Sequence, residues 1–170
     1  MSELILKAII RLFAVVARQD GVTEQEREQI KIFLKEHIAE GKIEYYLSLF
    51  DEYTKPGAHS AQADTHTLQQ ECDEINRGLT QKQKIIIVLE LERIVLADEK
   101  ISAREEELMH IICESFKVKE EDLASIRQFV VGQEASELDH EGLLIIDAHE
   151  DKDFAHAKHI RKAHLKGLIE

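Results

Sequence analysis

Two short acidic clusters contain the residues of this sequence best suited to chemistry. Each lies where a turn meets the start of a helix, and the candidate metal ligands are Asp20, Glu24, Glu26, Asp98, Glu99 and Glu105. Carboxylates that converge from two such turns could hold a hard divalent cation, Ca²⁺ or Mg²⁺, through oxygen ligands. Neither turn is an EF-hand, because neither has the D-x-D-x-D-G loop with a glutamate at its twelfth position.

The same carboxylates also have a structural alternative. Thr23 with Glu26, and Ser102 with Glu105, have the spacing of a capping box, in which a hydroxyl and a carboxylate satisfy free backbone N–H groups. Acidic residues in a first turn further stabilise the helix dipole, by about 0.3–1 kcal/mol each. The residues alone leave both the cation-binding and the capping role open.

Histidines and cysteines could also bind a metal or react, but their spacing matches no defined motif. His156 and His159 would share one face of a helix and, with His149, His164 or Asp153, could bind Zn²⁺ or Ni²⁺. Exposed histidines in a polar tail are the alternative. Cys72 and Cys113 have no metal or redox spacing, so we expect buried free thiols.

Motifs of common enzymes are absent from the sequence. It has no glycine-rich phosphate loop, nucleophile elbow or H-E-x-x-H zinc motif. We therefore expect a non-enzymatic protein. The alternative from another class is a metal-dependent hydrolase that uses the carboxylates of the acidic turns, and it would need an open, water-bearing metal position.

The hydrophobic pattern predicts the helices that must position these turns. The segment 85–96 is apolar on nearly every face, which is typical of a helix at the centre of a bundle. Apolar residues at helical spacing predict further helices from Leu4 to Arg18, Thr23 to about Ala39, Ile43 to Tyr53, Asp64 or Thr65 to about Arg77, Ser102 to Cys113, and Glu120 to Val131. The sequence thus predicts an all-α fold, a single bundle of about seven helices.

An internal repeat relates the two acidic turns. Adding 79 to a position maps Leu12 to Leu91 and Val16 to Val95, so core positions match core positions. The same shift maps the capping pair Thr23 and Glu26 to Ser102 and Glu105. We expect two helix–turn–helix units related by an approximate two-fold axis and packed through the first and the central helix.

The net charge of the protein limits the classes of partner that it can bind. The 170 residues carry 34 acidic and 22 basic side chains, a net charge of −12, which disfavours binding to nucleic acid or to anionic lipid. Glu3, Lys7 and Arg11 interrupt the apolar N-terminal run, so we expect no membrane insertion and a cytoplasmic location. Protein partners are expected, while the oligomeric state is not indicated.

The end of the chain differs in pattern. We expect the helical domain to span residues 4–131, and residues 132–170 to form a linker and the start of a truncated, β-rich second domain. A short apolar run at residues 143–146 permits a strand near the C-terminus.

One of the acidic turns carries a family signature. The segment 97–105, ADEKISARE, resembles the A-D-G-x-I-S-x-x-E signature of TerB-like domains, found in tellurite-resistance TerB proteins and in the N-terminal module of DjlA-type membrane co-chaperones. Segment 19–26 is similar to the same signature, and the resemblance covers about residues 4–131. The departures are Glu99, where the family usually has glycine, and Gln19, where it has aspartate.

The resemblance implies an all-helical fold of about seven helices with internal pseudo-symmetry and a cation site built from acidic residues. It also implies a non-enzymatic interaction or adaptor module of a bacterial stress-response or envelope-associated complex, held at the inner face of the membrane through partners. Because TerB-like modules are often fused to ATPases, a structural N-terminal domain of such a larger protein is a further alternative.

Overall fold

Seven α-helices form the part of the chain that the computed structural model describes, which is residues 2–57 and 60–132. They are α1 (Glu3–Ala17), α2 (Glu24–His37), α3 (Ile43–Thr54), α4 (Ala61–Gly78), α5 (Gln81–Val95), α6 (Ala103–Phe116) and α7 (Glu120–Gly132), with a 3₁₀ turn at Glu40–Lys42 before α3. No strand occurs within these ranges, which confirms the predicted all-α bundle. The predicted strand and the C-terminal histidines lie outside the described residues.

Side-chain caps define where most helices begin. Both predicted capping boxes are present, at the starts of α2 and α6. A third box opens α5, where the Gln83 amide oxygen accepts a hydrogen bond from the Thr80 backbone N–H at 2.8 Å. Each box satisfies backbone donors that the first turn would otherwise leave free.

The predicted start of α4 was wrong. The helix begins at Ala61, and its cap is Ser60, whose hydroxyl accepts a hydrogen bond from the Ala63 N–H at 3.1 Å. Asp64 is instead buried inside the helix and pairs with Arg18. A tertiary ion pair thus uses the carboxylate that the sequence suggested as a cap.

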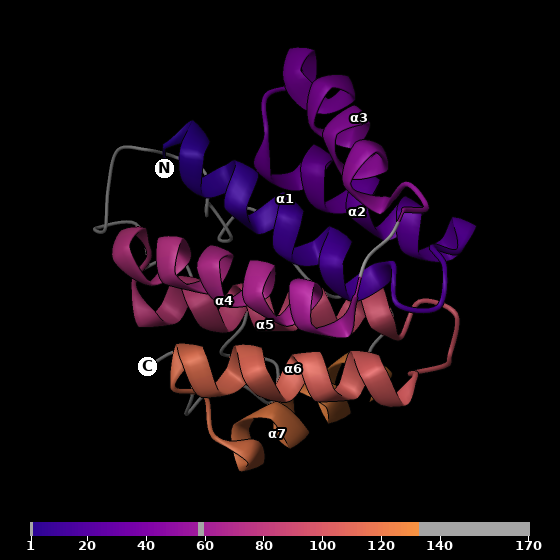
Figure 1. The fold of residues 1–170 in the computed structure, drawn as a ribbon. Helices are drawn as coiled ribbons and strands as arrows, with labels where there is room; N and C mark the ends of the chain where they lie inside the picture. Colours follow the sequence, from indigo (N-terminus) through magenta and orange to yellow (C-terminus); the bar gives the residue numbers. More distant parts are fainter. Residues whose placement is uncertain (1, 58–59, 133–170) are drawn as a thin grey trace.

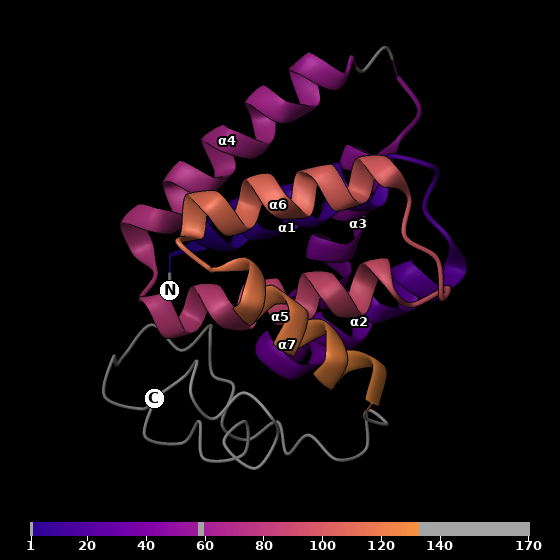
Figure 2. The same ribbon diagram turned by 90° about the horizontal axis from the view of Figure 1, so that it is seen from below.

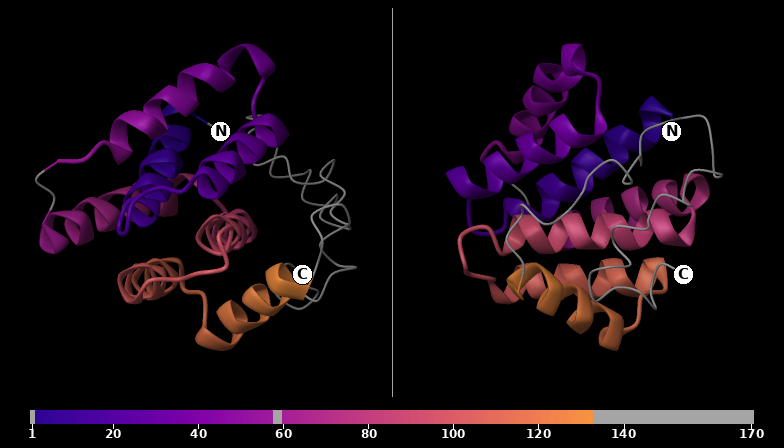
Figure 3. Two further views of the ribbon diagram at one scale, coloured as in Figure 1. Left: turned by 90° about the vertical axis from the view of Figure 1, so that its right-hand side faces the viewer. Right: turned by 180° about the vertical axis from the view of Figure 1, so that it is seen from behind.

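Helix α5 lies inside the bundle, as its apolar sequence predicts. It contacts α1, α2, α6 and α7, and ten of its fifteen residues are buried. Figure 3 (left) looks along α5 and α6 and shows α7 beside them. Two of the buried residues, Glu90 and Glu92, are acidic, so the centre of the fold holds charges that need partners.

The packing pattern fits two related repeats, α1–α3 and α5–α7. Helix α1 packs against α3 as α5 packs against α7, while α2 contacts α5 as α6 contacts α1. The remaining helix, α4, covers α1 and α6 (Figure 1 and Figure 2). None of the described helices has the length and apolar character needed to cross a bilayer.

Candidate functional site

The two acidic turns lie side by side at one end of the bundle. The α1–α2 turn and the α5–α6 turn both reach the right-hand edge of Figure 1, and they remain adjacent in Figure 2. The arrangement follows from the repeat, because each turn ends one of the two helices, α1 and α5, that pack together in the core. The fold thus brings together carboxylates that are about 79 residues apart in the sequence.

The capping boxes of the two turns have matching geometry. The Glu26 carboxylate accepts a hydrogen bond from the Thr23 N–H at 2.7 Å, and Glu105 accepts one from the Ser102 N–H at 2.7 Å. In return each hydroxyl accepts from the glutamate's own backbone N–H at 3.2 Å. The predicted correspondence between the two turns therefore extends to individual hydrogen bonds.

Both capping glutamates are buried, with exposed fractions of 2% for Glu26 and 1% for Glu105. Burial raises the pKa of Glu26 to about 7, with the charges of Glu105 and Asp98 adding to the rise and the hydrogen bonds from Thr23 opposing it. Burial also raises the pKa of Glu105, helped by the charges of Asp20 and Asp98. The end of the bundle therefore concentrates negative charge that is incompletely neutralised.

The Glu105 carboxylate has one oxygen available for a ligand. Its Oε2 accepts the capping hydrogen bond, whereas its Oε1 is buried and has no hydrogen-bond partner among the described residues. A buried carboxylate oxygen without a partner is costly, and a bound cation would remove that cost.

The other predicted ligands lie nearer to the surface. Asp98 is half-buried, and its Oδ1 accepts a hydrogen bond from the Lys100 N–H at 3.1 Å. Asp20, Glu24 and Glu99 are exposed. The charges of these aspartates act on the capping glutamates. Asp98 contributes to raising the pKa of both Glu26 and Glu105, and Asp20 contributes to raising that of Glu105. The charge of Glu24 instead contributes to raising the pKa of Arg27.

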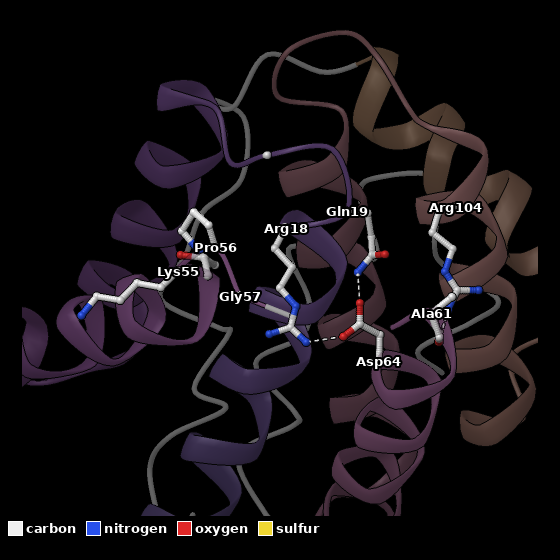
Figure 4. Close-up of a pocket in the computed structure, with 10 residues that line it drawn as sticks. Arg18, Gln19, Lys55, Pro56, Gly57, Ala61, Asp64 and Arg104 are labelled. Carbon is white, nitrogen blue, oxygen red and sulfur yellow. Dashed lines mark hydrogen bonds and ion pairs between the residues drawn. The ribbon is translucent and has the colours of Figure 1, made fainter. Parts of the chain in front are cut away.

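A pocket of about 390 Å³ adjoins the first acidic turn (Figure 4). Arg18 and Gln19, at the end of α1, both point toward Asp64 on α4. Arg18 forms an ion pair with this carboxylate, and Gln19 Nε2 donates to its Oδ2 at 3.1 Å. Arg104, on the opposite wall, donates to the Ala61 carbonyl at 2.7 Å. These contacts lock α1, α4 and α6 together, and sequence reasoning did not find them.

Sequence reasoning also missed a cluster of potential metal ligands away from the turns. Over residues 2–57 and 60–132, a group of three His, Cys, Asp or Glu side chains whose ligand atoms all lie within 4.8 Å of one another occurs at Glu36, His37 and Glu90. The carboxylates of the acidic turns do not form such a group in the described residues. Acidic residues inside the apolar sequence of α5 were the available signal.

The two cysteines are buried and free, as predicted. Burial raises the pKa of both thiols to about 12. Because the thiolate is the reactive form, neither cysteine is suited to nucleophilic chemistry at neutral pH.

Comparison with known proteins identifies the family. A family model described as "Tellurite resistance protein TerB" matches residues 6–128, which is more than two thirds of the chain and includes both acidic turns. No significant match was found among curated proteins or among solved structures. The chain belongs to the TerB family, as its duplicated turn signature predicts.

Proposed function

We propose that this protein is a non-enzymatic interaction module that binds a hard divalent cation, Ca²⁺ or Mg²⁺, between its paired acidic turns. The observation that carries the proposal is the burial of two carboxyl groups, those of Glu26 and Glu105, where the two acidic turns lie side by side. Both are buried at one end of the bundle, and Glu105 Oε1 has no hydrogen-bond partner among the described residues. A cation with oxygen ligands suits this group of carboxylates.

Electrostatics supports a cation at this end of the molecule. The raised pKa values of Glu26 and Glu105 mean that ionising them in their buried positions costs free energy. A divalent cation would supply the missing positive charge, and its binding would release protons from these groups near neutral pH. Asp20 and Asp98 add negative charge at the rim of the site, where a cation enters.

The chemistry of the surrounding residues favours binding over catalysis. Both thiols have a pKa of about 12, and in the adjacent pocket Arg18 and Asp64 pair with each other. The capping glutamates accept hydrogen bonds from backbone N–H groups, which fixes their carboxylates at the starts of α2 and α6.

A cation at the turns would make partner binding conditional. A bound cation would neutralise part of the negative charge at the acidic turns, and so would change which protein surfaces these turns attract. Since the whole protein has a net charge of −12, a partner with basic residues suits it. Membership of the TerB family supports a role in a bacterial stress-response complex. Our proposal includes attachment of that complex to the inner face of the membrane through the partner.

Isothermal titration of Ca²⁺ and of Mg²⁺ into chelator-treated protein tests the cation site. The Asp20→Asn/Asp98→Asn double variant removes two charges from the site and leaves both capping boxes intact. We expect the wild type to bind one of these cations and the double variant to bind it at least tenfold more weakly.

A matched control removes the same charge elsewhere. The Asp73→Asn/Glu114→Gln variant alters two exposed carboxylates on α4 and α6, and we expect it to bind as the wild type does. Absence of Ca²⁺ and Mg²⁺ binding by the wild type would rule out the cation site. If cation binding weakened equally in both double variants, the cause would be the lower net charge of the protein and not the acidic turns.

A further inference from the structure

A second group of ligands joins the two repeats away from the acidic turns. Glu36 and His37 are the last two residues of α2, and Glu90 lies on α5, against which α2 packs. One ligand atom from each lies within 4.8 Å of the other two, and His37 Nε2 is 3.9 Å from Glu36 Oε2. His37 follows Glu26 by 11 positions on α2, so this group is about 16 Å along the helix from the acidic turns.

The group is buried without being sealed. The exposed fractions of the side chains are 14% for Glu36, 0% for His37 and 4% for Glu90. Burial is the main cause that raises the pKa of both carboxyls, to about 7 for Glu36, and the charge of Glu90 adds to that rise. Glu36 is therefore the one of the three side chains that lies nearest to solvent.

Positive charge near the two carboxylates comes from Arg93. Its Nη1 lies 3.0 Å from Glu90 Oε1, and its charge lowers the pKa of Glu36 and of Glu90. A divalent cation at this place would be bound by the imidazole and by both carboxylates, and its charge would add to that of Arg93 in favouring their ionised forms.

The donor set selects the class of metal. Imidazole nitrogen together with two carboxylate oxygens suits Zn²⁺, Co²⁺, Ni²⁺ or Mn²⁺, whereas Ca²⁺ and Mg²⁺ take oxygen ligands alone. In a tetrahedral site with bonds of about 2.0–2.2 Å, neighbouring ligand atoms lie about 3.4 Å apart. The three ligand atoms therefore need to approach one another by at most about 1.4 Å, through rotation of the two glutamate side chains.

We propose that Glu36, His37 and Glu90 form a binding site for a divalent transition-metal ion of the Zn²⁺ class, with water completing the coordination. The ion would join α2 of the first repeat to α5 of the second. Because it would bind the folded chain and bridge its two halves, it would stabilise the domain. This site differs in position and in ligand chemistry from the hard-cation site proposed at the acidic turns.

Cobalt titration of the full-length protein tests the proposal. Co²⁺ substitutes for Zn²⁺ and reports four- or five-coordinate nitrogen and oxygen sites by its visible absorption. Since the C-terminal histidines are potential competitors, we would use as background the chain in which His149, His156, His159 and His164 are all replaced by alanine. On that background we expect one equivalent of Co²⁺ to bind, Zn²⁺ to displace it, and Zn²⁺ to raise the melting temperature.

Variants that remove one ligand at a time decide which residues bind the metal. Glu90→Gln, Glu36→Gln and His37→Gln, each on the same background and checked for helical content by circular dichroism, should weaken Co²⁺ binding at least tenfold. Glu36→Gln changes the most exposed of the three ligands, so it decides the matter if the other two variants fail to fold. The Asp20→Asn/Asp98→Asn variant should bind Co²⁺ as the background protein does.

The proposal is overturned if the background protein binds no stoichiometric Co²⁺ or Zn²⁺, or if folded Glu36→Gln binds as tightly as its parent. Loss of Co²⁺ binding in the Asp20→Asn/Asp98→Asn variant would also overturn it, since the metal would then lie at the acidic turns.

Discussion

Glu26 and Glu105 cap corresponding helices of the two repeats through hydrogen bonds of equal length, and the charge of Glu105 contributes to raising the pKa of Glu26 to about 7. Each carboxylate thus has a favourable local role and an unfavourable long-range one. The local role stabilises the start of a helix, and the long-range one places like charges close together in a buried setting.

Replacing Glu26 by glutamine should separate the two roles. Glutamine serves the same position in the box of Thr80 and Gln83, so we expect Glu26→Gln to keep the cap. The folded-state pKa of about 7 lies above the ordinary value of 4.5, so the folded wild type binds this proton more tightly and loses stability as pH rises from about 4.5 to 7.

The glutamine variant should be free of that loss. We expect it to match the wild type near pH 4.5 and to exceed it by up to about 3 kcal/mol in unfolding free energy at pH 8. Urea denaturation in chelator across this range measures the difference. Parallel stability curves for the two proteins would show that the Glu26 carboxyl is not the cause.

Removing the partner of a buried charge should be costly. Glu92 is fully buried, and it accepts hydrogen bonds from Arg127 Nε at 3.0 Å and Nη2 at 2.9 Å. Arg127→Met would leave the carboxylate without these donors, and we expect a loss of about 3 kcal/mol in the free energy of unfolding. Adding Glu92→Leu should recover most of the loss, because the double variant no longer contains a fully buried carboxylate without donors, and Glu106, the other partner of Arg127, is partly exposed to solvent.

An exposed ion pair provides the control for that prediction. Arg77 pairs with Glu74 at the surface of α4, so Arg77→Met should change stability by less than about 0.5 kcal/mol. Equal effects of the two arginine variants in urea denaturation would contradict a special role for Arg127.

Gly78, the last residue of α4, permits a close approach to Ile5. A Cβ atom at this position would lie 1.8 Å from Ile5 Cδ1 and 2.8 Å from its Cγ1. Gly78→Ala should therefore destabilise the domain by about 1 kcal/mol, although alanine is ordinarily the better helix residue. Combining it with Ile5→Ala should abolish this penalty in a double-mutant cycle.

Gly132, the last residue of α7, is the matched control, because a Cβ there meets nothing within 4 Å. Gly132→Ala should be neutral or slightly stabilising in thermal denaturation. A destabilisation as large as that of Gly78→Ala would assign the effect to helix ends in general.

Glu99 adopts a left-handed backbone conformation with φ of 62° in the second acidic turn. Such a conformation favours glycine, so Glu99→Gly should stabilise the protein by about 0.5–1 kcal/mol. Lys100, the next residue, is likewise exposed but has no positive φ, and Lys100→Gly should not stabilise. Melting temperatures of the two variants measure the contrast, and a gain in both would point to the loss of side chains instead.

Local features of this fold were predictable from the sequence. The helices follow apolar spacing, and the boxes of Thr23 and Ser102 follow from a hydroxyl and a glutamate three residues apart, which is chemistry within one turn. The matching of the two turns followed from the shift of 79 residues, and their hydrogen-bond geometry agrees with it.

The detailed course of the two turns could not be predicted. In the repeat register Gly21 corresponds to Lys100, yet within the two acidic turns the residues with positive φ are Gly21 and Glu99. Helix α1 also extends to Ala17, one position beyond the residue that matches the end of α5 at Val95. Predictions of such turns depend on the preference of glycine for the left-handed region, and a glutamate at this position goes against that preference.

Long-range pairing was also beyond sequence reasoning. Glu92 meets Arg127 across 35 residues, and Arg18 meets Asp64 across 46. Acidic residues within an apolar helix signal that a partner exists, but only the packing of α5 against α7 decides which side chain it is. The group of Glu36, His37 and Glu90 was missed for the same reason, since it forms where α2 crosses α5.

The exchange of partners between repeats, with α2 against α5 and α6 against α1, has a consequence for assembly. Helix α2 covers α5 of the second repeat, and α6 covers α1 of the first. A chain cut between Gly78 and Thr80 would therefore leave both fragments with exposed apolar helix faces. We expect neither fragment to fold as a monomer, and the mixed fragments to reassociate into one interlocked unit.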